Sequence, residues 1–179
     1  MKFLKVASNR IVGGAVLAAL ATLVMLVAVP LLPGFTFLKL DLSDIVVLLA
    51  FFAYGPAVGV LVAFCKVLLA WLLTGLSLGG LVGNFAALIS TLSFCGPIYW
   101  LWNKDRWHGQ ALVTGIISLT IMMALANYYF LLPVYMQVMG WQINMSLSHY
   151  LMWGVVPFNL IKGAINSSLF LILWQRIKA

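Results

Sequence analysis

Long apolar runs separated by short polar segments dominate the chain. A straight helix needs about 20 mostly apolar residues to cross the hydrocarbon core of a bilayer, and the first run of that length covers residues 11–30. It ends at the Pro-Leu-Leu-Pro-Gly sequence of residues 30–34. Residues 35–43 mix aromatic, basic and acidic side chains, which favours a loop at the outer interface.

The next apolar run, residues 45–74, is too long for one span. The Tyr54-Gly55-Pro56 sequence divides it, because proline suits a helix start and disfavours helix before itself. Ser43 and Asp44 favour a start just before this run, as an N-cap and an acid in the first turn. The pattern then predicts a short second helix, a third at 56–74, a turn at 75–80, and spans at 81–102, 110–132 and 149–174. Residues 103–108 are predicted to be aqueous, and 133–148 to form an aromatic, polar linker across the outer mouth.

The amino-acid composition indicates which fold class this pattern belongs to. Of the 179 residues, 65% are hydrophobic and only 7% are charged, whereas a soluble domain carries about 25% charged residues. Most of the surface must therefore face lipid. We predict an all-α integral membrane protein, with residues 1–179 forming a single domain of six transmembrane helices in one bundle.

The net charge of +7 does not indicate a nucleic-acid partner, because the basic residues flank the predicted spans. Under the positive-inside rule such clusters lie in the cytoplasm. The three clusters are Lys2, Lys5 and Arg10; Lys104 and Arg106; and Arg176 and Lys178. They therefore predict that both termini and the segment between the fourth and fifth spans lie in the cytoplasm.

Two lysines lie in the middle of predicted spans, Lys66 in the third and Lys162 in the sixth. A charge at mid-bilayer costs at least about 2.5–3.5 kcal/mol, so each is a candidate functional residue. The chain has three acids in all. We expect Lys66 to form an internal ion pair with Asp44 or Asp41. At most one lysine is then expected to have a strong partner, leaving the other to backbone carbonyls, water or a ligand.

Asparagines accompany Lys162. Asn159 lies one helical turn before it, Asn127 lies near the outer end of the fifth span, and Asn84 lies inside the fourth. Each amide alone is explained by a helix–helix hydrogen bond. Together they predict an outward-opening pocket suited to a planar small molecule with polar edges. Its candidate aromatic walls are Phe35, Phe37, Tyr128, Tyr135, Trp141 and Phe158.

The first helix carries small residues at four-residue spacing, which permits close helix contact. Gly14, Ala15, Ala18 and Ala19 form this pattern, and both packing within the chain and docking of a partner fit it.

Catalytic signatures are absent from the sequence. It has no nucleotide-binding Gly-x4-Gly-Lys-Ser/Thr, no His-Glu-x2-His and no carboxylate pair within a span. Cys65 and Cys95 lie in apolar runs and are expected to be small buried hydrophobes. We therefore expect no metal, no cofactor, no ATPase site and no enzyme activity.

Five motifs occur in order: Lys39-Leu-Asp-Leu-Ser-Asp-Ile45, Tyr54-Gly-Pro56, Gly83-Asn-Phe85, Asn127-Tyr-Tyr-Phe-Leu-Leu-Pro133 and Pro157-Phe-Asn-Leu-Ile-Lys-Gly163. Together they resemble the riboflavin-binding S components of energy-coupling factor (ECF) transporters. The resemblance implies a vitamin-capturing subunit of a bacterial plasma membrane. Its partners would be a transmembrane coupling subunit (EcfT-like) and two ATP-binding-cassette ATPases.

The same resemblance implies roles for particular residues. Asn127, Asn159 and Lys162 would contact the flavin ring, with Asn84, Tyr128 and Phe158 also at the site. Ala15 and Ala19 would lie on the docking surface.

The substrate is left open by two departures from the riboflavin members. Lys66-Val67 stands where those have Lys-Asn, and Leu81-Val82 where they tend to have a polar residue. Pantothenate or a pyridoxine-type vitamin is an alternative substrate. Alternatives of another class are a self-sufficient homo-oligomeric channel or transporter and, with less support, an intramembrane enzyme.

Overall fold

The chain is helical nearly throughout in the computed structural model, which describes residues 2–32, 35, 38–102, 108–140 and 146–178. The helices of the first half are α1 (Lys2–Leu26), α2 (Ser43–Tyr54), α3 (Pro56–Leu73) and α4 (Leu78–Trp102). In the second half, α5 (His108–Ala126) continues through the π-helical segment η1 (Asn127–Leu131) into α6 (Leu132–Met139). Likewise α7 (Leu147–Tyr150) continues through the π-helical η2 (Leu151–Val155) into α8 (Val156–Lys178).

The predicted six-helix membrane bundle is confirmed. Within the described residues, five helical stretches are long and apolar enough to cross a membrane, and α2 is a shorter apolar helix. The division of the run 45–74 falls where the sequence placed it. Gly55 separates α2 from α3 with a φ of 91°, a conformation that disfavours side-chain-bearing residues, and Pro56 begins α3.

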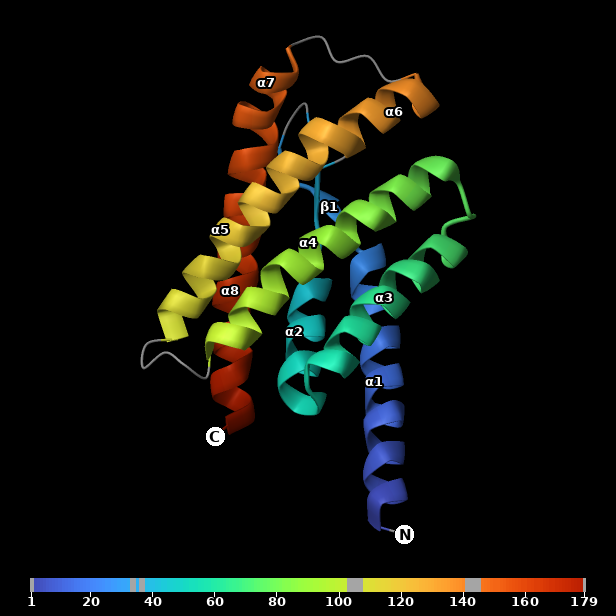
Figure 1. Ribbon diagram of the computed structural model, residues 1–179, viewed down its shortest axis with the longest axis vertical. Helices are drawn as coiled ribbons and strands as arrows, with labels where there is room; N and C mark the ends of the chain where they lie inside the picture. Colours follow the sequence, from blue (N-terminus) through green and yellow to red (C-terminus); the bar gives the residue numbers. More distant parts are fainter. Residues whose placement is uncertain (1, 33–34, 36–37, 103–107, 141–145, 179) are drawn as a thin grey trace.

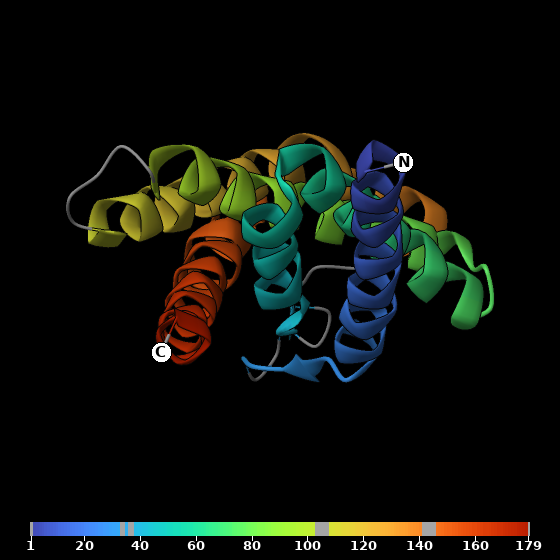
Figure 2. The ribbon, with the colours of Figure 1, turned by 90° about the horizontal axis from the view of Figure 1, so that it is seen from below.

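The helices form two layers. In Figure 2 the layer of α1, α2 and α8 lies below that of α3, α4 and α5. Figure 1 shows α1, α2 and α8 running nearly upright while α3, α4 and α5 lean across them, and both termini lie at the same end. Between the layers lie fully buried apolar side chains, among them Leu48, Phe94, Ile98, Leu119 and Phe170. Buried polar residues also lie between the layers, and they form the site described below.

The segment between α1 and α2 contains a short antiparallel pairing that the sequence did not predict. Strand β1 (Val29–Pro30) pairs with β2 (Lys39–Leu40). The N-cap position of α2 is Leu42, and the Ser43 backbone N–H donates to Asp41 Oδ1 at 3.1 Å. The prediction of Ser43 as N-cap was therefore wrong by one position, since Ser43 is already the first helical residue.

The predicted linker at 133–148 was wrong in its first part, because 133–139 is helical and extends the fifth span as α6. A proline inside a helix clashes with the carbonyl four residues earlier. Here Pro133 and Pro157 each follow a π-helical segment by two residues, and the wider π turn lets the helix continue. Residues 141–145 of the predicted linker lie outside the described residues.

Candidate substrate-binding site

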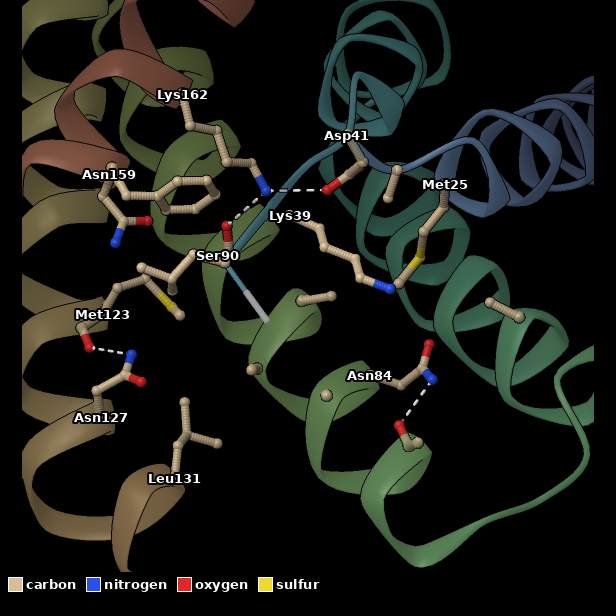
Figure 3. A pocket seen from close by; sticks show the side chains of 18 of the residues that line it. Met25, Lys39, Asp41, Asn84, Ser90, Met123, Asn127, Leu131, Asn159 and Lys162 are labelled. Carbon is tan, nitrogen blue, oxygen red and sulfur yellow. Dashed lines mark hydrogen bonds and ion pairs between the residues drawn. The ribbon is translucent and has the colours of Figure 1, made fainter. Parts of the chain in front are cut away.

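A cavity of about 390 Å³ opens between the two layers. That volume lies within the range of about 300–1,000 Å³ typical of small-molecule sites. Its walls come from the end of α1, from β2 and the loop after it, and from α3, α4, α5, η1, α6 and α8. Segments far apart in the sequence therefore meet at one site, part of which Figure 3 shows.

Three of the predicted site residues are asparagines that line this cavity: Asn84, Asn127 and Asn159. Each amide nitrogen donates to the carbonyl four residues earlier on its own helix. The acceptors are Gly80 at 2.8 Å, Met123 at 2.7 Å and Val155 at 2.7 Å, respectively. These contacts fix which end of each amide is nitrogen. Each side chain is thereby held in one orientation, with its carbonyl oxygen left to accept from another donor.

Only some of the aromatic residues predicted to form the walls of the pocket line the cavity. Phe158 and Tyr135 line the cavity. Phe35 does not, since it packs against Tyr150 with ring centroids 4.9 Å apart. Phe37 and Trp141 lie outside the described residues.

The prediction that Tyr128 lies at the binding site is wrong. Its side chain is 42% exposed, it contacts the ring of Tyr129, and it is not among the residues that line the cavity. Adjacent residues on a helix point in directions roughly 100° apart. Because Asn127 faces inward, its neighbour Tyr128 faces outward.

A buried ion-pair network lies beside the cavity. Lys66 and Asp44, the pair that the sequence suggested, lie 2.9 Å apart between Nζ and Oδ1. Lys66 Nζ also donates to Ser43 Oγ at 2.7 Å, and Ser43 Oγ in turn donates to Asp41. Thr91 Oγ1 donates to Asp44 Oδ1 at 2.6 Å. The network thus joins α2, α3 and α4.

Lys162 belongs to the same network, which overturns the expectation that at most one lysine has a strong internal partner. Its Nζ lies 3.0 Å from Asp41 Oδ2 and 3.1 Å from Asp44 Oδ2. Ser90 Oγ lies 3.2 Å away. The prediction failed because it assigned one acid to one lysine. In the structure Asp44 sits between both lysines and contacts each through a different oxygen.

The two lysines and two aspartates of this network sum to no net charge. Burial of four charges is tolerated because each ammonium faces a carboxylate and further hydroxyl groups. The wall that Lys162 and Asp41 contribute to the cavity is therefore polar but neutral. Such a wall suits an uncharged ligand better than an ion.

Several residues of the site were not predicted from the sequence. Ser90 and Thr91 carry no signal within an apolar helix, because hydroxyl residues are common there. Asn166 could have been predicted from the sequence, since it follows Lys162 by one helical turn. In the structure its Nδ2 lies 3.4 Å from Asp44 Oδ2. Lys39 lines the cavity from β2, which the sequence placed in a loop.

The small residues of α1 fall on two faces. Gly14 and Ala18 are buried, and a Cβ added to Gly14 would lie 2.9 Å from Val58 on α3. Ala15 and Ala19 are exposed. Packing within the chain therefore uses one face, and the other is covered by nothing in the described residues. Cys65 and Cys95 are both free, and only Cys95 is fully buried.

Comparison with known proteins identifies related chains over nearly the full length. The family model described as "ECF transporter, substrate-specific component" matches residues 9–174. The riboflavin transporter RibU of Staphylococcus aureus is 34% identical over 95% of this chain and 90% of its own. The riboflavin transporter FmnP of Bacillus subtilis is 29% identical over 95% and 92%. A solved chain described as the S component of a bacterial ECF transporter superposes with a TM-score of 0.81, at 31% identity and 96% coverage of both chains.

Proposed function

The chain belongs to the family of substrate-specific components of ECF transporters, and from this premise we propose that it captures riboflavin from outside the cell. It is a multi-pass membrane protein of the plasma membrane. The proposed ligand is neutral, planar along its ring system and polar at one edge of that ring. Those are the properties that the cavity's composition favours, and two relatives named as riboflavin transporters support the choice.

The observation that carries the proposal is the fixed orientation of Asn127 and Asn159 beside Phe158. The flavin ring presents two carbonyl oxygens with an N–H between them along one edge. Each amide offers a carbonyl oxygen that accepts and one amide proton not given to its own helix. The two side chains can therefore match such an edge, while Phe158 supplies an apolar surface for the ring.

We also propose that Lys162 contacts the polar edge of the flavin ring. In the structure three oxygen atoms lie within 3.2 Å of its ammonium, and Ser90 Oγ is the most distant of them. A ligand oxygen would replace Ser90, because a neutral hydroxyl is the weakest of the three acceptors. The two aspartates would keep the ammonium in place.

For transport we propose partners that supply ATP hydrolysis: a transmembrane coupling subunit and two ATP-binding-cassette ATPases. The family supports such an assembly. The exposed face of α1 around Ala15 and Ala19 is the proposed docking surface, since small side chains let another helix approach closely. This subunit itself is proposed to hydrolyse no ATP and to need no cofactor.

Binding by the purified protein tests the capture step. Titration of riboflavin, followed by quenching of its fluorescence, is expected to show saturable binding that pantothenate and pyridoxine do not displace. Saturable binding of one of those vitamins with no binding of riboflavin would overturn the substrate assignment. In cells, riboflavin uptake is expected to stop when the ATPases are deleted. Uptake that continued at the same rate would favour a self-sufficient transporter.

A further inference from the structure

Lys66 is buried behind the wall of the cavity and is not part of that wall. Its side chain is 1% exposed, whereas Lys162, the other lysine in the middle of a span, lines the cavity. Ser43 and Thr91 are placed as Lys66 is, since both are fully buried and neither is among the lining residues. We name these three residues the Lys66 group. Each of them contacts one of the two carboxylates that hold Lys162.

Asp44 divides its two oxygens between the Lys66 group and Lys162. Its Oδ1 accepts from Lys66 Nζ at 2.9 Å and from Thr91 Oγ1 at 2.6 Å. Its Oδ2 lies 3.1 Å from Lys162 Nζ. A carboxylate held by two donors at one oxygen has a fixed orientation, so the donors on Oδ1 determine where Oδ2 points.

Asp41 repeats this arrangement on the other side of Lys162. Its Oδ1 accepts from both the backbone N–H and the hydroxyl of Ser43, and Lys66 Nζ donates to that same hydroxyl at 2.7 Å. Its Oδ2 lies 3.0 Å from Lys162 Nζ. Lys66 therefore acts on both carboxylates, on one directly and on the other through Ser43, and both present their second oxygen to Lys162.

The charge of Lys66 also affects how strongly the aspartates attract Lys162. Without Lys66, two carboxylates would face a single ammonium, and a carboxylate is a stronger acceptor than a neutral ligand oxygen. Lys162 would then be drawn toward the aspartates. With Lys66 present there is one cation for each carboxylate, and the Lys162 ammonium lies 3.2 Å from Ser90 Oγ at the cavity wall. Figure 3 shows this ammonium between Asp41 and Ser90.

We propose that Lys66 is a positioning residue for ligand capture: acting through the two aspartates, it holds the Lys162 ammonium where a ligand oxygen can reach it. Ser43 and Thr91 assist by fixing the same carboxylates. The proposal rests on the proposed function, since it needs a ligand that accepts a hydrogen bond from Lys162. A group that is fixed before the ligand arrives loses little further freedom on binding. Affinity therefore depends on residues that the ligand does not touch.

Thr91→Val tests the proposal without removing a charge, because valine resembles threonine in shape and lacks the hydroxyl. Riboflavin affinity of the full-length purified protein, measured by fluorescence quenching, is expected to fall about three- to tenfold. Thr120→Val is the matched control. Thr120 is also a buried threonine, but its hydroxyl donates to Ile116 O on its own helix and it does not line the cavity. This control is expected to keep its affinity within about twofold.

Further variants separate the hydroxyl groups from the shape of the side chains. Thr91→Ser keeps the hydroxyl and is expected to restore riboflavin affinity to within about twofold of the unaltered protein. Ser43→Ala interrupts the path from Lys66 to Asp41 and is expected to weaken binding as Thr91→Val does. Lys66→Met, measured below its unfolding temperature, is expected to weaken binding more than either. If Lys66→Met does not fold, the two hydroxyl variants decide the question.

Double variants show whether the effect passes through Lys162. In a Lys162→Met background, Thr91→Val is expected to cause no further loss of affinity, because the ammonium to be positioned is gone. In an Asn127→Ala background, the full loss is expected to persist. Asn127 shares no partner with the network among the described residues, and the effects of independent sites add. Equal losses in both backgrounds would contradict positioning through Lys162.

The possible results separate this proposal from the one on which it rests. A Thr91→Val protein that unfolded at a lower temperature but bound riboflavin with unchanged affinity would show that the network only stabilises the fold. That result would overturn the positioning role alone, as would equal weakening in Thr120→Val. Failure of the unaltered protein to bind riboflavin would overturn the proposed function, and the positioning role with it.

Discussion

At the scale of single residues, the site depends on polar groups whose orientation the helix backbone fixes. Asn84, Asn127 and Asn159 each use the amide nitrogen on the carbonyl four residues earlier. In a membrane such a contact also compensates the donor without a partner helix. What is left over, one oxygen and one amide proton per side chain, is available to a ligand.

Asn159→Ala is expected to weaken riboflavin binding by roughly 5- to 150-fold, because it removes hydrogen bonds made in a buried site. Isothermal titration with the purified protein measures this. Ser168→Ala is the matched control, since Ser168 Oγ donates to Ala164 O on the same helix but lies exposed outside the cavity. An Asn159→Ala protein that bound riboflavin with unchanged affinity would contradict the assignment.

Lys66→Met is expected to destabilise the protein strongly, because it leaves Asp41 and Asp44 with one cation between them. Removing one partner of a buried ion pair costs about 3–5 kcal/mol. The thermal unfolding temperature in detergent is the measurement. The double variant Lys66→Met with Asp44→Asn restores neutrality and is expected to regain much of the loss. A double variant no more stable than the single one would show that neutrality is not what the network provides.

At the scale of elements, α1 uses two faces for two purposes. Gly14, Ala18 and Ala21 are buried within the chain, while Ala15 and Ala19 are exposed. Small residues on the first face let α1 lie close to α3, since a Cβ added at Gly14 would already crowd the side chain of Val58. The second face also carries small side chains, but no described residue of the chain packs over Ala15 and Ala19.

Ala19→Trp is expected to block docking of the coupling subunit without weakening riboflavin binding, since Ala19 lies outside the cavity. Co-purification with the coupling subunit and ATP-dependent uptake should both fall, while fluorescence titration of the isolated protein should not change. Ala164→Trp makes the same substitution at an exposed position on α8 and serves as the control. Equal loss of uptake in the two variants would count against the docking surface.

At the scale of the whole molecule, the site belongs to no single helix. The ion-pair network joins α2, α3, α4 and α8 to the segment after β2. The cavity draws on both layers of the bundle, and α6 and α8, which follow the two π-helical segments and contain Pro133 and Pro157, both contribute to its walls. A ligand held there contacts elements from most of the chain.

Riboflavin is therefore expected to stabilise the whole bundle, because a ligand that binds only the folded state adds free energy by mass action. At a ligand concentration 100 times the dissociation constant, the gain is about 2.7 kcal/mol. A single thermal unfolding transition that moves upward with riboflavin, and not with pantothenate, is the expected result. A transition that stayed in place at saturating riboflavin would contradict binding between the layers.

Much of the fold and part of the site could be predicted from the sequence for a simple reason: the bilayer imposes strict rules. Apolar run length predicted the spans, and Gly55 and Pro56 placed the break between α2 and α3, because few other residues suit that backbone. The cost of polar groups in lipid singled out Asn127, Asn159 and Lys162 from the sequence alone. The prediction failed at Pro133, since a π-helical segment before it lets the helix continue.

By itself, then, the sequence determined that this is a helical membrane protein with a few polar residues set within its spans. Only the tertiary structure decided how those residues pair. Asp44 contacts both lysines through its two oxygens, and Tyr128 turns outward while Asn127 turns inward. It also brought Asn84 and Lys39 to the wall opposite Asn159. The physical reason is that insertion cost depends on each segment alone, whereas pairing depends on how the two layers cross.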